Sequence, residues 1–333
     1  MRLHLFRHFR LAAGIAVTLG SLPSVAQELA FPADCAPGQD CFVQQYPDMA
    51  PGPEAVDPFC GTATYDGHDG VDLRLLSMTD VARGVPVLAM ADGRVLRWRD
   101  EEPDRPVLTA DDRAEVGNRE CGNGAVIDHG EGIEIQYCHL RQGSLAVRSG
   151  DIVREGDKIG EISASGLAQF PHLHVTIRKE GRPIDPLTGR MIGEDCGEPG
   201  APSEPLFSDP ALEALEQGRG HFLAFGLAGS VVDHSQLVLS GPPPRPSSAS
   251  PALVGWAWLR NLHEGDQVLI EIADPSGGAF VSRTTEALDR PKATYTAYAG
   301  RRGAPLQGAY RVTVKLIRNG EPVSVRTEAY RIE

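Results

Sequence analysis

The chain has 333 residues, of which 41% are hydrophobic and 23% are charged, and its formal net charge at pH 7 is −13. An acidic protein of this kind attracts neither nucleic acid nor anionic membranes by its overall charge, so we expect neither as a partner. At roughly 150 residues per domain, the length predicts two domains, each large enough to bury a core.

Residues 1–26 are predicted to be a signal peptide. Three arginines among the first ten residues precede a short apolar run, Leu11–Leu22, and Ser24-Val25-Ala26 offers the small residues that a signal peptidase needs. The apolar run is shorter than the roughly 20 residues of a spanning helix, and the alternative is a retained membrane anchor. We expect an exported protein, periplasmic or extracellular, with no integral membrane segment in the mature chain.

Six cysteines follow this segment: Cys35, Cys41, Cys60, Cys121, Cys138 and Cys196. An even number of cysteines in an exported protein predicts disulfides, here three. Cys35 and Cys41 are close enough to close a local loop, but the sequence alone does not choose among the pairings. The sequence contains no Cys-x-x-Cys, which argues against a redox motif and against a zinc ribbon.

Residues 27–59 are rich in proline, glycine and aspartate, and are predicted to form an irregular N-terminal lead. Residues 60–190 contain short apolar runs separated by glycine-rich turns, among them Val85–Ala89, Ala125–Ile127 and Ile133–Tyr137. Such runs predict strands joined by tight turns, and therefore an antiparallel β domain.

Residues 191–215 are predicted to be an interdomain linker, with a short helix that begins near Leu212. Strand-like segments return in residues 216–333, for example Val268–Ile272 and Tyr310–Leu316. Their spacing predicts a small β-sandwich as an accessory domain.

An acidic segment, residues 99–120, interrupts the first β domain. It carries eight acidic residues and little apolar periodicity. The simplest interpretation is a solvated surface insertion. The alternative is a lid beside the functional site that selects or gates the substrate.

The most informative pattern is a set of histidines around one aspartate. His68 and Asp72 are four residues apart, and His172 and His174 are two residues apart. Side chains at i and i+2 of a strand point to the same face, so His172 and His174 project together while Leu173 faces the core. Two histidines and one carboxylate can bind zinc with a position left for water, which is typical of catalytic zinc. We therefore expect Zn²⁺ as the cofactor.

A further histidine, His139, lies at the end of the predicted strand over residues 133–139. On strict alternation, Tyr137 and His139 share one face of this strand and Cys138 points to the other. We therefore expect Cys138 to point away from whatever His139 approaches, which favours a disulfide over a metal-binding role for this cysteine.

Taken together, the ordered motifs resemble those of the lysostaphin-like (LytM-type) zinc endopeptidases: His68-x-x-x-Asp72, Tyr137-x-His139-Leu140 and His172-x-His174. The resemblance covers roughly residues 60–190. It implies an all-β fold with a lysostaphin-like antiparallel sheet built on a duplicated hybrid motif, to which the predicted C-terminal β-sandwich is added.

The resemblance also implies a role for each matching residue. His68, Asp72 and His174 would bind zinc, while His139 and His172 would be catalytic, beside a metal-bound water. Members of this family cleave the peptide cross-bridges of peptidoglycan. Residues 164–171 and the acidic insertion depart from the common form of the family, which leaves the substrate preference open.

We therefore predict an exported zinc-dependent endopeptidase that hydrolyses peptide cross-links of peptidoglycan. Two alternatives remain. One is a catalytically silent lysostaphin-like protein that binds the cell wall or activates another hydrolase, and the other is a zinc peptidase that acts on free peptides. The accessory domain could bind the wall, an envelope protein partner or its own catalytic domain, and a purely structural role is equally compatible with the sequence.

Overall fold

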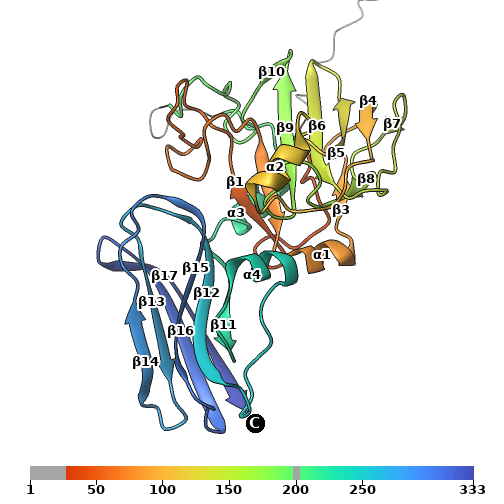
Figure 1. Cartoon of the computed structure of the whole chain (residues 1–333). Helices are drawn as coiled ribbons and strands as arrows, with labels where there is room; N and C mark the ends of the chain where they lie inside the picture. Colours follow the sequence, from red (N-terminus) through yellow and green to blue (C-terminus); the bar gives the residue numbers. More distant parts are fainter. Residues whose placement is uncertain (1–27, 198–202) are drawn as a thin grey trace, which may run out of the picture.

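The computed structural model describes residues 28–197 and 203–333, so the predicted signal peptide lies outside the described residues. The chain forms two units rich in antiparallel sheet, one above the other in Figure 1. The prediction of an all-β fold is confirmed, because the four helices of the described chain have only six to nine residues each. Within the same residues, none of the helices has the length and apolar character needed to cross a membrane.

The N-terminal unit is built on an eight-stranded sheet with the order β1-β2-β9-β6-β5-β4-β7, and β10 pairs with β9. Its strands are β1 (Cys41–Gln45), β2 (Val71–Leu75), β4 (Gly93–Arg99), β5 (Asn123–Asp128), β6 (Ile133–Leu140), β7 (Ile152–Val153), β9 (His172–Lys179) and β10 (Arg182–Pro183). A separate ladder joins β3 (Pro86–Leu88) to β8 (Lys158–Glu161). The helices of this unit are α1 (Met78–Arg83), α2 (Ala110–Val116) and α3 (Asp209–Gln217).

The C-terminal unit is a β-sandwich, as predicted. One sheet has the order β11-β12-β15 and the other has the order β14-β13-β16-β17. The strands are β11 (Phe222–Ala228), β12 (Ala252–Leu262), β13 (Gln267–Ala273), β14 (Ala279–Thr284), β15 (Lys292–Arg302), β16 (Gly308–Arg318) and β17 (Glu321–Ile332), and α4 spans His234–Ser240. Apolar side chains from both sheets, such as Leu253, Ile270 and Val312, fill the space between them.

Alternation along the central strands divides the large sheet into two faces. Leu173, Val175 and Ile177 of β9 are all buried in the core of the N-terminal unit, as the sequence predicts. The intervening residues of β9 therefore point to the opposite face. That opposite face carries the polar residues of the candidate site.

All six cysteines form disulfides, as expected for three pairs. The bonds join Cys35 to Cys41, Cys60 to Cys196, and Cys121 to Cys138. The first closes the local loop that the sequence suggests, and the third ties the approach to β5 onto β6.

Two segments that the sequence presents as an irregular lead and a linker take part in the N-terminal unit. Within residues 27–59, β1 pairs with β2, and Leu29 is completely buried. Within residues 191–215, Phe207 and Ala211 are buried in the same core. Leu29, Phe207 and Ala211 belong to apolar runs of only two or three residues, which are too short to show a periodicity from which burial could be predicted.

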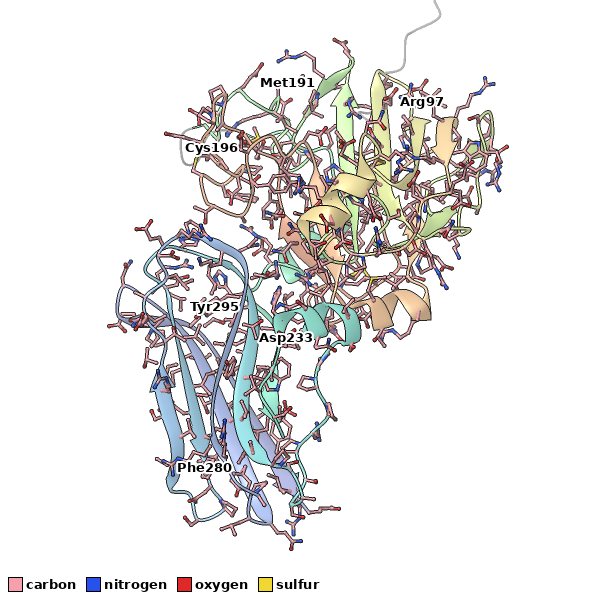
Figure 2. The ribbon with its side chains drawn as sticks, viewed as in Figure 1. Arg97, Met191, Cys196, Asp233, Phe280 and Tyr295 are labelled. Carbon is pink, nitrogen blue, oxygen red and sulfur yellow. A yellow bond between two sulfur atoms is a disulfide. The ribbon has the colours of Figure 1, made fainter. Side chains whose placement is uncertain are left out.

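The two units meet along an apolar junction. Phe42, Leu76 and Phe170 of the N-terminal unit pack with Trp258 and Leu237 of the C-terminal unit. Figure 2 labels Asp233, the N-cap of α4, at this junction, and Phe280 near the far end of the sandwich.

Polar groups add to the junction. The Arg74 guanidinium is completely buried and stacks on the rings of Phe170 and Trp258, with 4.3 and 4.8 Å from its central carbon to the ring centroids. The buried Arg260 guanidinium donates across the junction to the carbonyls of Val43 and Gly218.

Candidate active site

Three of the predicted site residues converge on the polar face of the large sheet. Asp72 on β2 lies directly opposite His174 on β9, and His68 lies in the loop that leads into β2. Oδ1 of Asp72 is 2.9 Å from Nδ1 of His174 and 3.2 Å from Nε2 of His68. The same two nitrogens are 3.2 Å apart. The three donor atoms thus surround one point.

This donor set fits a divalent metal ion. Zinc bonds of about 2.0–2.1 Å in a tetrahedral arrangement separate ligand atoms by about 3.3 Å, so only small movements would be needed. His68 and Asp72 are 1% and 2% exposed, so their donor atoms would bind an ion with little competition from bulk water. Three protein donors would leave a fourth tetrahedral position for a substrate or water.

The outer nitrogens of both imidazoles are also bound. Nδ1 of His68 donates to the carbonyl of Tyr46 at 2.6 Å. Nε2 of His174 faces Oδ1 of Asp69 at 3.2 Å and Oγ1 of Thr176 at 2.9 Å. Each ring, when neutral, can therefore carry its proton on the outer nitrogen and present a lone pair at the shared point, as metal-binding histidines require.

The other two predicted residues lie beside this cluster. The rings of His139 and His172 are 4.4 Å apart between centroids, and Nε2 of His172 is 3.6 Å from Oδ1 of Asp72. Nδ1 of His139 donates to the carbonyl of Ser165 at 2.7 Å, and Nδ1 of His172 donates to that of Phe170 at 2.9 Å. In both rings Nε2 is left as the proton acceptor.

Burial and neighbouring charges shift the pKa values of His139 and His172 in the same direction. Burial holds the pKa of His139 well below its usual range, and the nearby His172 and His174 act in the same direction. Burial also lowers the pKa of His172, against the opposing charge of Asp72. Both rings are therefore neutral near pH 7 and able to accept a proton.

His174 and Asp72 are shifted in the directions of a charged pair. Burial by itself lowers the pKa of His174, but hydrogen bonds to Asp69 and Asp72 outweigh it and raise the pKa to about 9. Burial opposes ionisation of Asp72, but the neighbouring imidazoles of His68 and His172 and the hydrogen bonds from His174 and His68 hold its pKa well below the usual range. A metal ion would replace the proton on His174, because both occupy the same lone pair.

The position of His139 corrects one expectation. Cys138 lies directly opposite His174 in the sheet, so it is on the face of the metal cluster and does not point away from it. His139 reaches the same cluster because its backbone is in the left-handed region, with φ of 63°, which breaks the alternation of β6. The sequence gives no sign that a non-glycine residue adopts a positive φ, so the prediction that Cys138 points away from the cluster was wrong. The prediction that Cys138 forms a disulfide is confirmed.

Sequence reasoning missed three side chains that border the metal cluster. Asp69 and Thr176 bind His174, and the Tyr65 ring stacks on His68 with 4.5 Å between centroids. Thr176 had a usable signal, because it is two residues beyond His174 and therefore shares its face of β9.

The acidic insertion contacts the segment that holds His139. Val107 donates to the carbonyl of Ala168, and Asp104 forms an isolated bridge with Ser165, whose carbonyl binds His139. All residues of α2 are exposed or half-buried. Arg113 of this helix is close enough to Tyr65 to lower the pKa of its hydroxyl group, against the dominant effect of burial. The insertion therefore borders the cluster, and its action as a lid stays a prediction.

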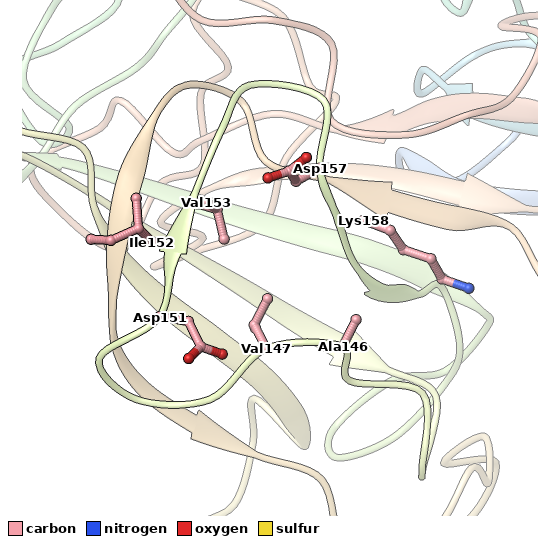
Figure 3. A pocket seen from close by; sticks show the side chains of 7 residues that line it. All are labelled: Ala146, Val147, Asp151, Ile152, Val153, Asp157 and Lys158. Carbon is pink, nitrogen blue, oxygen red and sulfur yellow. The ribbon is translucent and has the colours of Figure 1, made fainter.

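Two surface hollows differ in their relation to the site. A hollow of about 400 Å³ is lined by Asp151, Ile152, Asp157 and Lys158 among others (Figure 3), at the β7 edge of the sheet and four strands away from β9. A groove of about 360 Å³ runs instead over β4, β5 and β6. One of its lining residues is Gln136, the neighbour of Thr176 across the β6–β9 pair, so this groove begins beside the strand that carries His174.

Comparison with known proteins agrees with this geometry. Residues 66–186 match the profile of Peptidase family M23, and all five predicted site residues fall within this segment. The DD-carboxypeptidase/endopeptidase Mpg of Neisseria meningitidis serogroup B is 31% identical over 125 residues, which are 38% of this chain and 23% of that protein. The peptidoglycan DD-endopeptidase ShyB of Vibrio cholerae is 30% identical over 104 residues, which are 31% of this chain and 20% of that protein.

These similarities concern one part of the chain. An uncharacterised metalloprotease of Haemophilus influenzae is 29% identical over 130 residues, and the matched part is 22% of its length. This chain thus spans about a fifth to a quarter of the length of the curated relatives it matches. A solved zinc-containing peptidase from Vibrio cholerae is 25% identical and covers 48% of this chain, which itself covers 39% of that structure. Its TM-score of 0.33 is too low to support the fold, which rests on the sheet topology.

Proposed function

We propose, from the premise that residues 66–186 are a domain of peptidase family M23, that this protein is a zinc-dependent endopeptidase of peptidoglycan. One observation carries the proposal. His68, Asp72 and His174 aim three donor atoms at one point, and the outer nitrogen of each imidazole is already bound to an acceptor. Such an arrangement is expected of a site that binds a metal ion rather than of a histidine cluster that packs in a core.

In this proposal Nε2 of His68, Oδ1 of Asp72 and Nδ1 of His174 hold the ion. When bound, zinc supplies a Lewis acid that polarises a peptide carbonyl and lowers the pKa of water. The burial of His68 and Asp72, together with the mostly covered side chain of His174, limits competition from solvent at their donor atoms.

His139 and His172 would move the proton. Each donates its Nδ1 proton to a main-chain carbonyl, so each has an unprotonated Nε2. One ring would accept a proton from the attacking water and return it to the leaving amine. The other would first take up a proton from solvent at Nε2 and would then donate it in a hydrogen bond to the developing oxyanion. The positions of the two rings support either division of these roles.

Cross-linked peptidoglycan peptides are the proposed substrate class, because two of the similar proteins carry endopeptidase names and one of these specifies peptidoglycan. The groove that begins beside β9 and runs over β6, β5 and β4 would bind the extended peptide. Export to the periplasm or beyond, which the N-terminal segment predicts, would bring the enzyme to that substrate.

The direct test is chelator-sensitive release of fragments from peptidoglycan. Purified residues 27–333 are incubated with cross-linked muropeptides, with a chelator, and with a chelator followed by excess zinc. We expect products that vanish with the chelator and return with zinc. Absence of any product would instead favour the silent wall-binding or activating protein. Cleavage of glycine-rich free peptides without cleavage of muropeptides would identify a peptidase of free peptides.

A further inference from the structure

We propose that Asp69 is a positioning residue for the metal site, which accepts the Nε2 proton of His174 and thereby directs Nδ1 of that ring at the ion. The inference rests on the proposed function, because it concerns the ligand set of the same site. It assigns a role to a residue that lies between two ligands in the sequence without itself offering an atom to the shared point.

The contact belongs to a closed network of polar groups. Oδ1 of Asp69 is 3.2 Å from Nε2 of His174 and 3.2 Å from Oγ1 of Thr176. Oγ1 of Thr176 is in turn 2.9 Å from the same nitrogen of His174. The other carboxylate oxygen, Oδ2, accepts from Nη2 of Arg178 at 3.4 Å. The Thr176 hydroxyl can thus donate to Asp69 while it accepts from His174, which satisfies all members of the triangle.

This network determines which tautomer His174 adopts. A metal ion binds the lone pair of a neutral imidazole, so the proton must be on the opposite nitrogen. Asp69 is an obligate acceptor when ionised and faces Nε2, whereas Oδ1 of Asp72 lies 2.9 Å from Nδ1 and would itself bind the ion. With an ion bound, the proton that remains on the ring is therefore the one on Nε2, which Asp69 accepts. A carboxylate also strengthens the ligand by polarising the ring through the N–H bond.

The main chain is built to hold Asp69 in this place. A Cβ atom on Gly70 would lie 2.8 Å from Cε1 and 2.9 Å from Nε2 of His174. Only glycine therefore lets the backbone that carries Asp69 pass so close to the ring. The side chain of Asp69 is 44% exposed, so its orientation toward His174 is not forced by burial.

The two metal-binding imidazoles are oriented by different acceptors. Nδ1 of His68 donates to a neutral main-chain carbonyl, that of Tyr46. Nε2 of His174 is the one with a charged partner. A hydrogen bond to an ionised acceptor is roughly twice as strong as a neutral one, so a change at Asp69 weakens the His174 ligand specifically.

The test compares Asp69→Ala and Asp69→Asn with Asp66→Asn, a matched change in an exposed aspartate three residues earlier. The zinc dissociation constant of each full-length mature protein is measured by competition with a fluorescent chelator. We expect weaker zinc binding by about 10- to 100-fold in Asp69→Ala, a smaller loss in Asp69→Asn because an amide oxygen still accepts, and no change in the control.

A spectroscopic measurement separates positioning from a general loss of structure. In the zinc-loaded proteins, the ¹⁵N shift of the protonated Nε2 of His174 should differ between wild type and Asp69→Ala, because the hydrogen bond to the carboxylate is lost, while the far-ultraviolet circular dichroism spectrum stays the same. Wild-type zinc affinity in Asp69→Ala would overturn the inference. A wild-type protein that binds no zinc would instead contradict the proposed function itself, and the first titration reports that before any variant is compared.

Discussion

At the scale of residues, His174 and His139 lie in one cluster, with 6.0 Å between their ring centroids, but their contacts give them different roles. We predict that His174→Ala removes zinc, because Nδ1 of His174 is one of the three donors. In contrast, we predict that His139→Ala keeps zinc but lowers turnover by about 10²- to 10⁴-fold, because a proton acceptor is lost. Metal analysis after dialysis, together with hydrolysis rates, checks both. His263→Ala in the C-terminal unit is the control, and equal zinc loss in His174→Ala and His139→Ala would show that the ligand assignment is wrong.

The charge on His174 also predicts how stability depends on pH in chelator-treated protein. Burial lowers the pKa of His174, but the hydrogen bonds that it donates to Asp69 and Asp72 outweigh burial and raise the pKa to about 9, above its usual value of 6.5 in an unfolded chain. Because the folded protein holds the His174 proton more tightly than the unfolded chain does, protonation of His174 contributes its full stabilisation below pH 6.5. This contribution is lost as the pH rises through 9.

We therefore expect the thermal unfolding midpoint of the chelator-treated protein to fall between pH 6.5 and about 9, for a loss of up to about 3 kcal/mol. The fall should be much smaller in His174→Gln, which cannot be charged. A midpoint that stays constant over this range in the wild-type protein would contradict the assigned pair of His174 with its two aspartates.

At the scale of elements, α2 is the part of the acidic insertion that can be changed without disturbing its anchors. Val107 and Glu102 hold the insertion to Ala168 and Asn123, whereas the residues of α2 are exposed or half-buried. Replacing residues 110–116 by the same number of glycine and serine residues should therefore cost little stability.

We expect this replacement to raise the rate of hydrolysis of large cross-linked peptidoglycan fragments, because α2 would restrict their access to the groove. Rates on short peptides should stay the same, because such peptides do not extend to α2. A comparison of initial rates on the two substrate sizes is the measurement. Equal rates for the variant and the wild-type protein on both would leave the segment as a solvated surface insertion.

The strands β9 and β6 show how far alternation could be applied. On β9 the expected order of core-facing and site-facing residues is confirmed from His172 to Ile177, because these side chains lie on regular antiparallel ladders with β2 and β6. On β6 the same rule fails at His139, where the left-handed backbone turns one residue out of register. Regular strands can thus be oriented from sequence, but a local change in φ cannot be anticipated.

At the scale of the whole molecule, the C-terminal unit is joined to the site by a chain of ring contacts. Trp258 stacks on Arg74, Arg74 stacks on Phe170, and the Phe170 ring lies 4.7 Å from that of His172. The C-terminal unit is therefore packed against the part of the N-terminal unit that carries the candidate site and is not merely tethered to it.

Trp258→Ala tests this coupling. Trp258 is completely buried, so we expect a loss of about 3–5 kcal/mol in the free energy of unfolding, and lower turnover at unchanged zinc content because Phe170 and His172 lose their support. Tyr298→Ala, on the same sheet but half-exposed, is the matched control. Calorimetry and zinc analysis check both variants. Unchanged turnover in a folded Trp258→Ala protein would limit the junction to a structural role.

The sequence by itself determined the all-β fold and the set of chemically reactive side chains. The alternation of apolar residues and the spacing of the site residues are short-range patterns, so they can be recognised without knowledge of the fold. The site residues concerned are His68, Asp72, His172 and His174. The tertiary structure alone decided the disulfide pairing, the incorporation of residues 28–59 and 203–217 into the N-terminal unit, and the contacts of Asp69 and Arg74. These features depend on which distant segments become neighbours, and that is set by the packing of the whole core and not by any short stretch of sequence.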